Sequence, residues 1–442
     1  MLADMKKNYA KSLLLILMVL FLFACTVSRQ QVAKPDSFLP GDALPDAPEL
    51  SARGPFPIGV RTIDIVNKRQ MNILAYGSGG DSLYDRPLRL EIWYPAIIPP
   101  GREMITTYAD MLGMKNDSTR PLIPFQFFGR ALRDAVPYLT SGPFPLIIVS
   151  HGYPGSRVLM TYLTENLASK GYVVVAIDHT ESTHGDAAGF QSTLLNRSTD
   201  ILFVLNEMSM AAKPGSDSFL SGLVDADHTG LIGYSMGGYG VLNAAGAGYS
   251  EKLLAFFKLL TKGSSAISSL TAADPGYRAS RDLRIKAVVA FAPWGMQRGV
   301  WDDKGLEGLQ QPLFLVAGSL DDVSGYEDGT RAIYTGAVHA QRYLLTYENA
   351  RHNTAPNPPP AESLVPGRAP GYYYHYAEPA WDQRRINNIN QHFVTAFFGK
   401  FLKMNGEGKF LDISPKPLPK EWSGFKQRTA VGLELLHAGS IP

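Results

Sequence analysis

The sequence predicts an α/β protein in which helices cover both faces of a mostly parallel sheet. Short apolar or β-rich runs alternate along the chain with segments whose apolar residues recur at helical spacing. Because two parallel strands must be joined by a crossover, which is usually a helix, this alternation indicates βαβ units. The runs expected to be strands are residues 60–66, 88–93, 145–150, 172–177, 229–233, 286–291, 313–317 and 343–347.

Helices are expected where apolar residues recur every three or four positions. This spacing is clearest in residues 159–170, in residues 194–210 and in a C-terminal series formed by Ile386, Ile389, Phe393, Phe397 and Phe401. No helical segment separates the first two strands, so we expect them to pair as an antiparallel edge. The stretches expected to be insertions that wall a substrate site are residues 104–140, 249–281 and 354–381.

The N-terminal residues have the pattern of a targeting segment. Lysines precede an unbroken apolar run over residues 13–24, which is too short to span a bilayer of ~30 Å. The run ends in Leu22-Phe23-Ala24-Cys25, which is similar to a lipobox. We therefore expect residues 1–24 to be removed and Cys25 to carry a lipid that anchors the chain to a membrane of the bacterial cell envelope. The alternatives are an ordinary signal peptide or an uncleaved anchor.

The rest of the chain is expected to form one domain with a tether before it. Residues 25–57 are rich in Pro, Asp, Ala and Ser and lack a period, which is typical of a tether. Residues 58–404 would form the α/β domain, and residues 405–442 an extension packed on it. Removing residues 1–24 takes three lysines and one aspartate from 42 basic and 40 acidic residues, leaving 39 of each. A neutral chain gives no reason to expect nucleic acid as a partner.

One short stretch predicts a nucleophilic serine at a forced turn. Residues 233–237 read Gly-Tyr-Ser-Met-Gly, the Gly-x-Ser-x-Gly pattern, directly after the apolar end of a strand. A serine on a sharp strand-to-helix turn has a strained backbone, and glycines two residues on either side let the strand and the helix approach closely. The turn would expose the Ser235 hydroxyl at the C-terminal edge of the sheet.

A nucleophilic serine needs an acid and a base, which are expected downstream, where later strands end. The strand at 313–317 is followed by Asp321 and Asp322. The spacing from Gly318 favours Asp321 as the acid, and Asp322 is the alternative.

The base is expected on the loop that follows the strand at 343–347. His352 lies on this loop. His375 is the alternative, because its tyrosine-rich loop could fold over the site.

The strand ending at Ser150 runs into His151-Gly152-Tyr153, where an oxyanion hole is expected. The backbone N–H groups of Tyr153 and Met236 would stabilise the negative charge that develops on the substrate oxygen, and His151 would be structural. Trp294 is expected to line the substrate groove, with core packing as the alternative. Asp178, His179 and His184 lack a further ligand at a sensible spacing, so no metal is expected.

Taken together, these motifs resemble the α/β-hydrolase superfamily, and within it the platelet-activating-factor acetylhydrolase and predicted dienelactone-hydrolase group. The resemblance extends from about Gly59 to Leu402. It implies the α/β-hydrolase fold with loop or lid insertions, and a short acyl chain on a phospholipid as substrate. The segments that carry it are Arg86–Pro95, Ser150–Gly152, Gly233–Gly238 and Ala396–Phe398.

A second resemblance is to cutinase-type polyester hydrolases, in which an aromatic residue and a tryptophan flank the substrate. His151-Gly152-Tyr153 and Ala292-Pro293-Trp294 carry this likeness. Dienelactone hydrolases proper use a cysteine nucleophile, whereas Cys25 is the only cysteine here, so that activity is not expected.

The function expected from these observations is hydrolysis of short-chain or phospholipid esters by a serine nucleophile, through an acyl-enzyme. The alternatives are a cutinase-like polyester hydrolase and a binding lipoprotein that keeps the fold without catalysis. The expected partners are a small ester or lipid substrate and the membrane, with no metal or organic cofactor. The pattern leaves the oligomeric state open.

Overall fold

The computed structural model describes residues 38–77, 82–415 and 422–441, and residues from Leu39 onward form one compact unit. The expected signal peptide and Cys25 lie outside the described residues. Among the helices that are described, none is long and apolar enough to cross a membrane.

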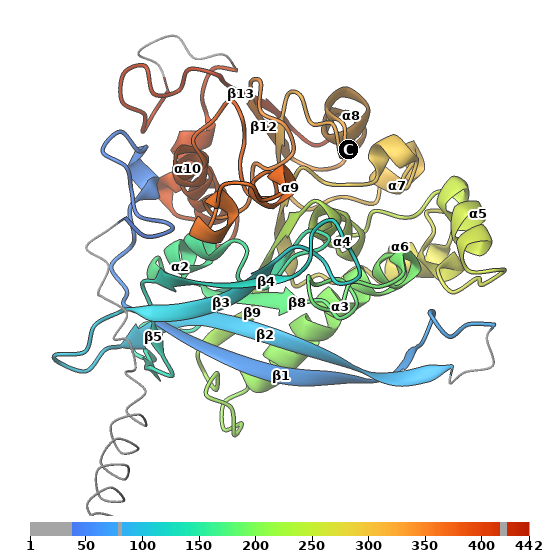
Figure 1. The fold of residues 1–442 in the computed structure, drawn as a ribbon, viewed down its shortest axis with the longest axis horizontal. Helices are drawn as coiled ribbons and strands as arrows, with labels where there is room; N and C mark the ends of the chain where they lie inside the picture. The colour runs from blue at the N-terminus through green and yellow to red at the C-terminus, as the bar shows by residue number, and fades with distance from the viewer. Residues whose placement is uncertain (1–37, 78–81, 416–421, 442) are drawn as a thin grey trace, which may run out of the picture. The chain divides into compact units, whose positions relative to one another are not determined.

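The predicted α/β class is confirmed by an eleven-stranded sheet with a parallel centre (Figure 1). Ten of its strands follow the order β13-β12-β11-β10-β9-β7-β8-β2-β1-β5, and β6 pairs with β2. The six central strands, β12 to β8 in that order, are parallel, whereas β2 pairs antiparallel with both β1 and β8, as expected for the opening pair. Their bounds are β1 Ile58–Met71, β2 Leu83–Ile97, β5 Leu132–Arg133, β6 Val136–Pro137, β7 Phe144–Ser150, β8 Val173–Asp178, β9 Val224–Tyr234, β10 Ile285–Phe291, β11 Leu313–Gly318, β12 Arg342–Tyr347 and β13 Leu433–Ala438.

Helices pack on both faces of this sheet, which explains why its central strands read as continuous apolar runs. In β7, for example, Ile147 and Val149 belong to the core beneath α2 and α10, whereas Leu146 and Ile148 belong to the core beneath α3 and α4. The α-helices are α2 Thr161–Ser169, α3 Phe190–Ala211, α4 Met236–Ala244, α5 Glu251–Leu260, α6 Pro275–Ala279, α7 Asp303–Leu306, α8 Arg331–Gly336, α9 Pro370–Tyr373 and α10 Gln383–Phe401. The short helices are η1 Glu49–Ser51, η2 Ser268–Leu270, η3 Met296–Arg298, η4 Tyr326–Thr330, η5 Ala361–Leu364 and η6 Gly406–Leu411.

The three stretches that break the alternation fold mostly outside the main sheet, and only the short β5 and β6 of the first stretch pair with it. Residues 104–140 contain a separate antiparallel pair, β3 (Thr106–Leu112) and β4 (Ile123–Gly129), followed by β5 and β6. Residues 249–281 form α5, η2 and α6, and residues 354–381 form η5 and α9.

The compact unit begins earlier than the boundary at residue 58 that we expect. The segment from Leu39 packs along α10, where the Leu44 N–H donates to Asn388 Oδ1 (2.9 Å) and the Ser51 hydroxyl donates to the Asn388 carbonyl (2.7 Å). This segment has no periodic pattern because polar side chains of a distant helix, rather than a strand or helix ladder, satisfy its backbone. At the other end of the chain, η6 packs on α10 and β13 pairs with β12.

The buried His392 on α10 makes the stability of this domain sensitive to acid. Its Nδ1 accepts a hydrogen bond from the Leu50 N–H (3.1 Å), and aromatic rings of Phe393, Phe410 and Phe425 surround it. Burial and, to a lesser degree, the charge of Lys170 lower the His392 pKa to about 3. Since an unfolded histidine titrates near pH 6.5, the unfolded chain binds a proton that the folded chain excludes between these values. The free energy of unfolding therefore falls as the pH falls through this window.

We expect His392→Gln, which keeps an acceptor for Leu50, to reduce this pH dependence by the equivalent of one proton, about 1.4 kcal/mol per pH unit. Urea unfolding measured at several values between about pH 6 and pH 4 tests this expectation. The exposed His437 supplies the control, His437→Gln, which should leave the slope unchanged. Equal slopes in the wild type and His392→Gln would contradict the prediction.

Candidate active site

The sharp turn between β9 and α4 consists of one residue, Ser235. Strand β9 ends at Tyr234 and helix α4 begins at Met236. Ser235 has φ 53° and ψ −114°, a conformation that side-chain-bearing residues rarely adopt. Its backbone is fixed on both sides, because its N–H donates to the Phe291 carbonyl (2.9 Å) and its carbonyl accepts from the Trp294 N–H (3.1 Å).

The two glycines of the Gly-x-Ser-x-Gly pattern are required by close backbone approach. A Cβ atom on Gly233 would lie 2.2 Å from the carbonyl oxygen of Gly237. A Cβ atom on Gly237 would lie 1.9 Å from the carbonyl oxygen of Ser150, at the end of β7. The glycines therefore let α4 pack directly against the ends of β9 and β7.

The structure brings Ser235, His352 and Asp321 together from the ends of three parallel strands. The Ser235 hydroxyl lies 3.0 Å from Nε2 of His352. The Nδ1 atom of His352 lies 3.0 and 3.1 Å from the two carboxylate oxygens of Asp321. If Nδ1 carries the proton and donates to Asp321, Nε2 presents its lone pair to the serine hydroxyl. All three residues are buried.

Asp321, and not Asp322, is in contact with the histidine. Oδ1 of Asp321 also accepts hydrogen bonds from the backbone N–H groups of Val323 (2.9 Å) and Ser324 (2.8 Å), which fix the carboxylate. Asp322 instead forms an ion pair with Arg351, with both side chains about half exposed. The hydrogen bond from Arg351 lowers the pKa of Asp322.

His375, the alternative base, lies in the wall of the same cleft but forms no hydrogen bond with Ser235 among the described residues. Its ring contacts His184, with ring centroids 5.1 Å apart. Burial lowers the pKa of His375 to about 3.

The expected oxyanion turn lies against the serine. A Cβ atom on Gly152 would lie 3.5 Å from Cβ of Ser235, and both Gly152 and Tyr153 line the cleft. Met236, whose N–H is the other expected donor, is the first residue of α4. His151 is buried behind the turn, where its Nε2 accepts from the His179 N–H (3.2 Å).

A network of buried polar side chains packs against the turn at residues 151–153. Arg197 on α3 donates to the His151 carbonyl (2.7 Å), and Ser150 Oγ lies 2.9 Å from Nε2 of His179. Nδ1 of His179 lies 2.9 Å from Asp200, which forms a two-point ion pair with Arg86 (2.8 and 2.9 Å). All three charged residues are buried, Arg86 and Asp200 are paired with each other, and Arg197 is held by the His151 carbonyl. They hold the turn in place without lining the cleft.

No motif in the sequence points directly to this network, although Arg86 falls in the Arg86–Pro95 segment. Arg197 and Asp200 are charged residues within a helix whose other buried positions are mostly apolar or small. A buried charge needs a partner, so charged residues at core-facing positions are the signal that could have found it.

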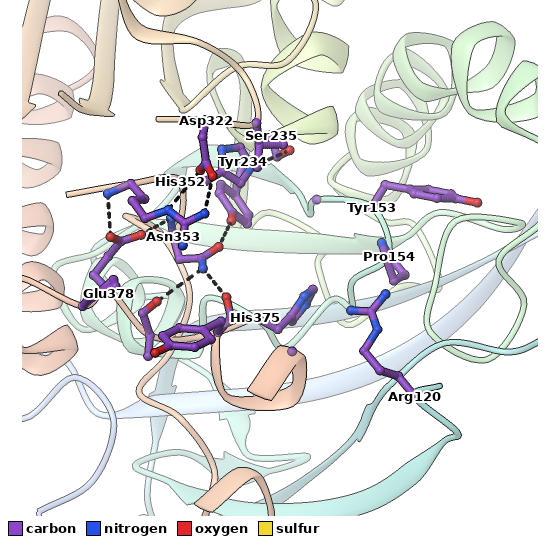
Figure 2. Close-up of a pocket in the computed structure, with 17 residues that line it drawn as sticks. Arg120, Tyr153, Pro154, Tyr234, Ser235, Asp322, His352, Asn353, His375 and Glu378 are labelled. Carbon is purple, nitrogen blue, oxygen red and sulfur yellow. Dashed lines mark hydrogen bonds and ion pairs between the residues drawn. The ribbon is translucent and has the colours of Figure 1, made fainter. Parts of the chain in front are cut away.

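The loop that carries His352 is clamped by Glu378, from the 354–381 insertion. The N–H groups of Arg351 and Asn353, on either side of His352, donate to the two oxygens of Glu378 at 2.6 and 2.5 Å. The Tyr234 hydroxyl donates to Asn353 Oδ1 (2.8 Å), and the Tyr234 ring packs on the imidazole (Figure 2). Burial raises the pKa of Glu378, and the two backbone donors oppose this shift.

We expect Glu378→Gln to lower kcat about tenfold while KM changes little, because an amide offers one acceptor oxygen to two N–H groups and the base loses its fixed position. Steady-state kinetics on a soluble ester test this expectation. Glu348→Gln, an exposed glutamate on the same loop, is the matched control. A rise in KM at constant kcat would instead indicate a role in substrate binding.

These side chains surround a cleft of about 310 Å³ (Figure 2). Tyr153 and Pro154 form one wall, and Tyr374, His375 and Glu378 from the 354–381 insertion form another. The prediction that insertions wall the site therefore matches this part of the cleft.

Trp294, which we expect in the substrate groove, is not among the residues that line this cleft. It packs on Phe190 and Tyr239, with ring centroids 5.1 and 6.2 Å away, which matches the core-packing alternative. As for metals, the described residues contain no group of three or more His, Cys, Asp or Glu side chains arranged to hold an ion.

Comparison with known proteins adds to this geometry. A family model described as PETase, PET hydrolase-like, matches residues 131–256, which include the oxyanion turn and Ser235. Cutinase 2 of Thermobifida cellulosilytica is 22% identical over 243 residues, which are 55% of this chain and 68% of that protein. Cutinase cut1 of Thermobifida fusca is 22% identical over the same length, which is 56% of that protein.

Among solved structures, a ferulic acid esterase from Streptomyces cinnamoneus has a TM-score of 0.53 and 20% sequence identity, covering 81% of this chain and 94% of that one. The sheet order and this structural likeness show that the chain has the fold of the α/β-hydrolase class. Within this class, the chain is similar to cutinases. The expected likeness to platelet-activating-factor acetylhydrolases stays a prediction.

Proposed function

We propose that the protein hydrolyses carboxylic esters through an acyl-enzyme on Ser235. The observation that carries this proposal is the unbroken series of hydrogen bonds from the Ser235 hydroxyl through His352 to Asp321. The similarity to cutinases and to the fold of a ferulic acid esterase supports ester hydrolysis as the reaction class.

Each residue has a distinct role in the proposed mechanism. Nε2 of His352 takes the proton as Oγ of Ser235 attacks the ester carbonyl, and Asp321 stabilises the imidazolium that forms. The N–H groups of Tyr153 and Met236 bind the oxyanion, a contribution of roughly 10²–10³ in rate for each such donor. His352 then protonates the departing alcohol, and a water molecule activated in the same way releases the acid.

The cleft favours a small acyl group. Its volume of about 310 Å³ is at the low end of the range for small-molecule sites, roughly 300–1,000 Å³. A short-chain ester, or the acetyl or short acyl ester of a phospholipid, is therefore the first substrate class that we propose.

A polyester surface is the second candidate, and exposed apolar residues at the cleft favour it. Val323 and Tyr374 line the cleft yet remain 47% and 45% exposed, and Leu320, beside Asp321, is 56% exposed. Apolar side chains at the mouth of a site can contact a flat apolar substrate.

A substrate panel tests the proposal and separates the two candidates. We expect hydrolysis of p-nitrophenyl esters to decline as the acyl chain lengthens from acetyl to palmitoyl. Release of acid from polyester particles, at a rate that Leu320→Ser and Val323→Ser reduce without affecting p-nitrophenyl acetate, would favour the polymer. Inactivity on every ester of the panel would refute the proposed function.

We further propose a location at the bacterial cell envelope, with Cys25 as the lipid attachment site. The support for this location is the sequence of residues 6–25 alone. Loss of the protein from salt-washed membranes on Cys25→Ser is the observation that tests it, because the wash removes proteins held only by surface charge.

A further inference from the structure

Helix α5 exposes a group of large apolar side chains to water. Leu259 is 80% exposed, Phe256 46% and Leu260 37%. In Figure 1 the helix lies at the margin of the molecule, away from the central strands. Single exposed apolar residues are ordinary, but three within five consecutive positions of one helix form a patch. Such a patch indicates contact with an apolar partner.

The opposite face of α5 is fixed to the domain, so the exposed face has a defined direction. Leu253, Leu254 and Phe257 are buried in the core. The helix begins at a side-chain cap, because Ser250 Oγ accepts a hydrogen bond from the Leu253 N–H (3.2 Å). The exposed leucines are therefore not the result of a loosely packed helix.

Positive charge flanks the apolar patch. Lys252, Lys258 and Lys262 are exposed, whereas Glu251 is the sole acidic residue from 251 to 262. Within the described part of the chain these lysines form no ion pair. At 3.6 residues per turn, Leu259 falls near the centre of the exposed arc. Lys252 lies almost in line with it two turns earlier, Lys258 lies at the edge of the arc, and Lys262 follows the C-terminal end of the helix. Apolar residues with lysines beside them are typical of helices that lie in a membrane interface.

We propose that α5 docks on an anionic phospholipid surface. Phe256, Leu259 and Leu260 enter the boundary between headgroups and acyl chains, and the three lysines contact lipid phosphates. A second copy of this chain is the less favoured occupant, because two such lysine-bearing faces would repel each other in a symmetric pair. This proposal goes beyond the proposed function, since none of these six residues lines the catalytic cleft.

The test measures the fluorescence of a dye attached to α5 in the full-length protein. The variant Cys25→Ser/Leu259→Cys carries one thiol, on the patch, for an environment-sensitive dye. The matched control is Cys25→Ser/Val431→Cys, because Val431 is 69% exposed and lies outside α5. Each labelled protein is mixed with vesicles of phosphatidylcholine, with and without phosphatidylglycerol, and with lipids that carry a quencher in the acyl chain.

We expect a blue shift and quenching at position 259 with phosphatidylglycerol vesicles, and little change at position 431. Replacing the three lysines by glutamine should weaken vesicle binding about a hundredfold, since each lysine near an anionic surface contributes about fivefold. Salt at about 0.5 M should weaken binding in the same direction.

Three outcomes would overturn the proposal. They are no change at position 259 with anionic vesicles, equal changes at positions 259 and 431, or a change that depends on protein concentration without vesicles, which would indicate self-association. Hydrolysis of a soluble ester by the lysine variant should equal that of the wild type. This control separates loss of docking from failure of the proposed catalytic function.

Discussion

Replacing Ser235 by alanine is expected to lower kcat/KM for p-nitrophenyl butyrate by at least about 10⁴, because the attacking atom is removed while the oxyanion donors remain. Labelling by a fluorophosphonate probe, which reacts with activated serines, should disappear in the same variant. Alanine and serine have the same backbone preferences at φ 53°, so thermal unfolding should change little.

The exposed Ser265 provides the control for this experiment. Ser265→Ala should keep both hydrolysis and probe labelling at wild-type levels. Full hydrolysis by Ser235→Ala would refute the proposed mechanism. Loss of hydrolysis together with a large fall in the unfolding temperature would point instead to damage at the turn.

The second large effect is expected for Asp321→Asn, which should lower kcat by about 10³–10⁴. An amide at this position can turn its NH₂ group toward Nδ1 of His352 and favour the tautomer whose Nε2 carries a proton. That tautomer cannot accept the proton of Ser235. The measurement is kcat on a soluble ester, with unfolding followed in parallel.

The neighbouring residue is a natural control, because Asp322→Asn makes the same chemical change one position away. Asp322 contacts Arg351 at the surface, and surface ion pairs contribute about 0–1 kcal/mol to stability. We therefore expect nearly wild-type activity from Asp322→Asn. The opposite ranking of the two variants would show that the acid is assigned to the wrong residue.

The sequence predicts those parts of the site that depend on chain order and strand position. Ser235, Asp321 and His352 each follow a run that reads as a buried strand, and the ends of parallel strands meet at one edge of the sheet. The choice between Asp321 and Asp322 depends on which carboxylate faces the imidazole. Sequence spacing favours Asp321, and the distances to His352 then distinguish the two.

Features that depend on contacts between distant segments are harder to predict. The segment that begins at Leu39 shows no periodic pattern of apolar residues. Its backbone is held by a distant side chain instead, since the Leu44 N–H donates to Asn388, 344 residues away. Glu378 clamps the His352 loop from an insertion that has no regular pattern. For Trp294, the sequence places a large apolar ring near the site but cannot tell whether the ring faces substrate or its neighbours in the core.

Strand β13, the antiparallel partner of β12, lies near the end of the chain, and this position has a consequence for synthesis of the protein. Strand β13 is made only after the ribosome has passed residues 348–432, so β12 presents an open row of amide and carbonyl groups in every nascent chain until then. A shortened product that lacks residues 433–438 would keep that row permanently open to strand exchange with another copy. Recombinant versions should therefore retain this region, even though it contributes no residue to the catalytic cleft.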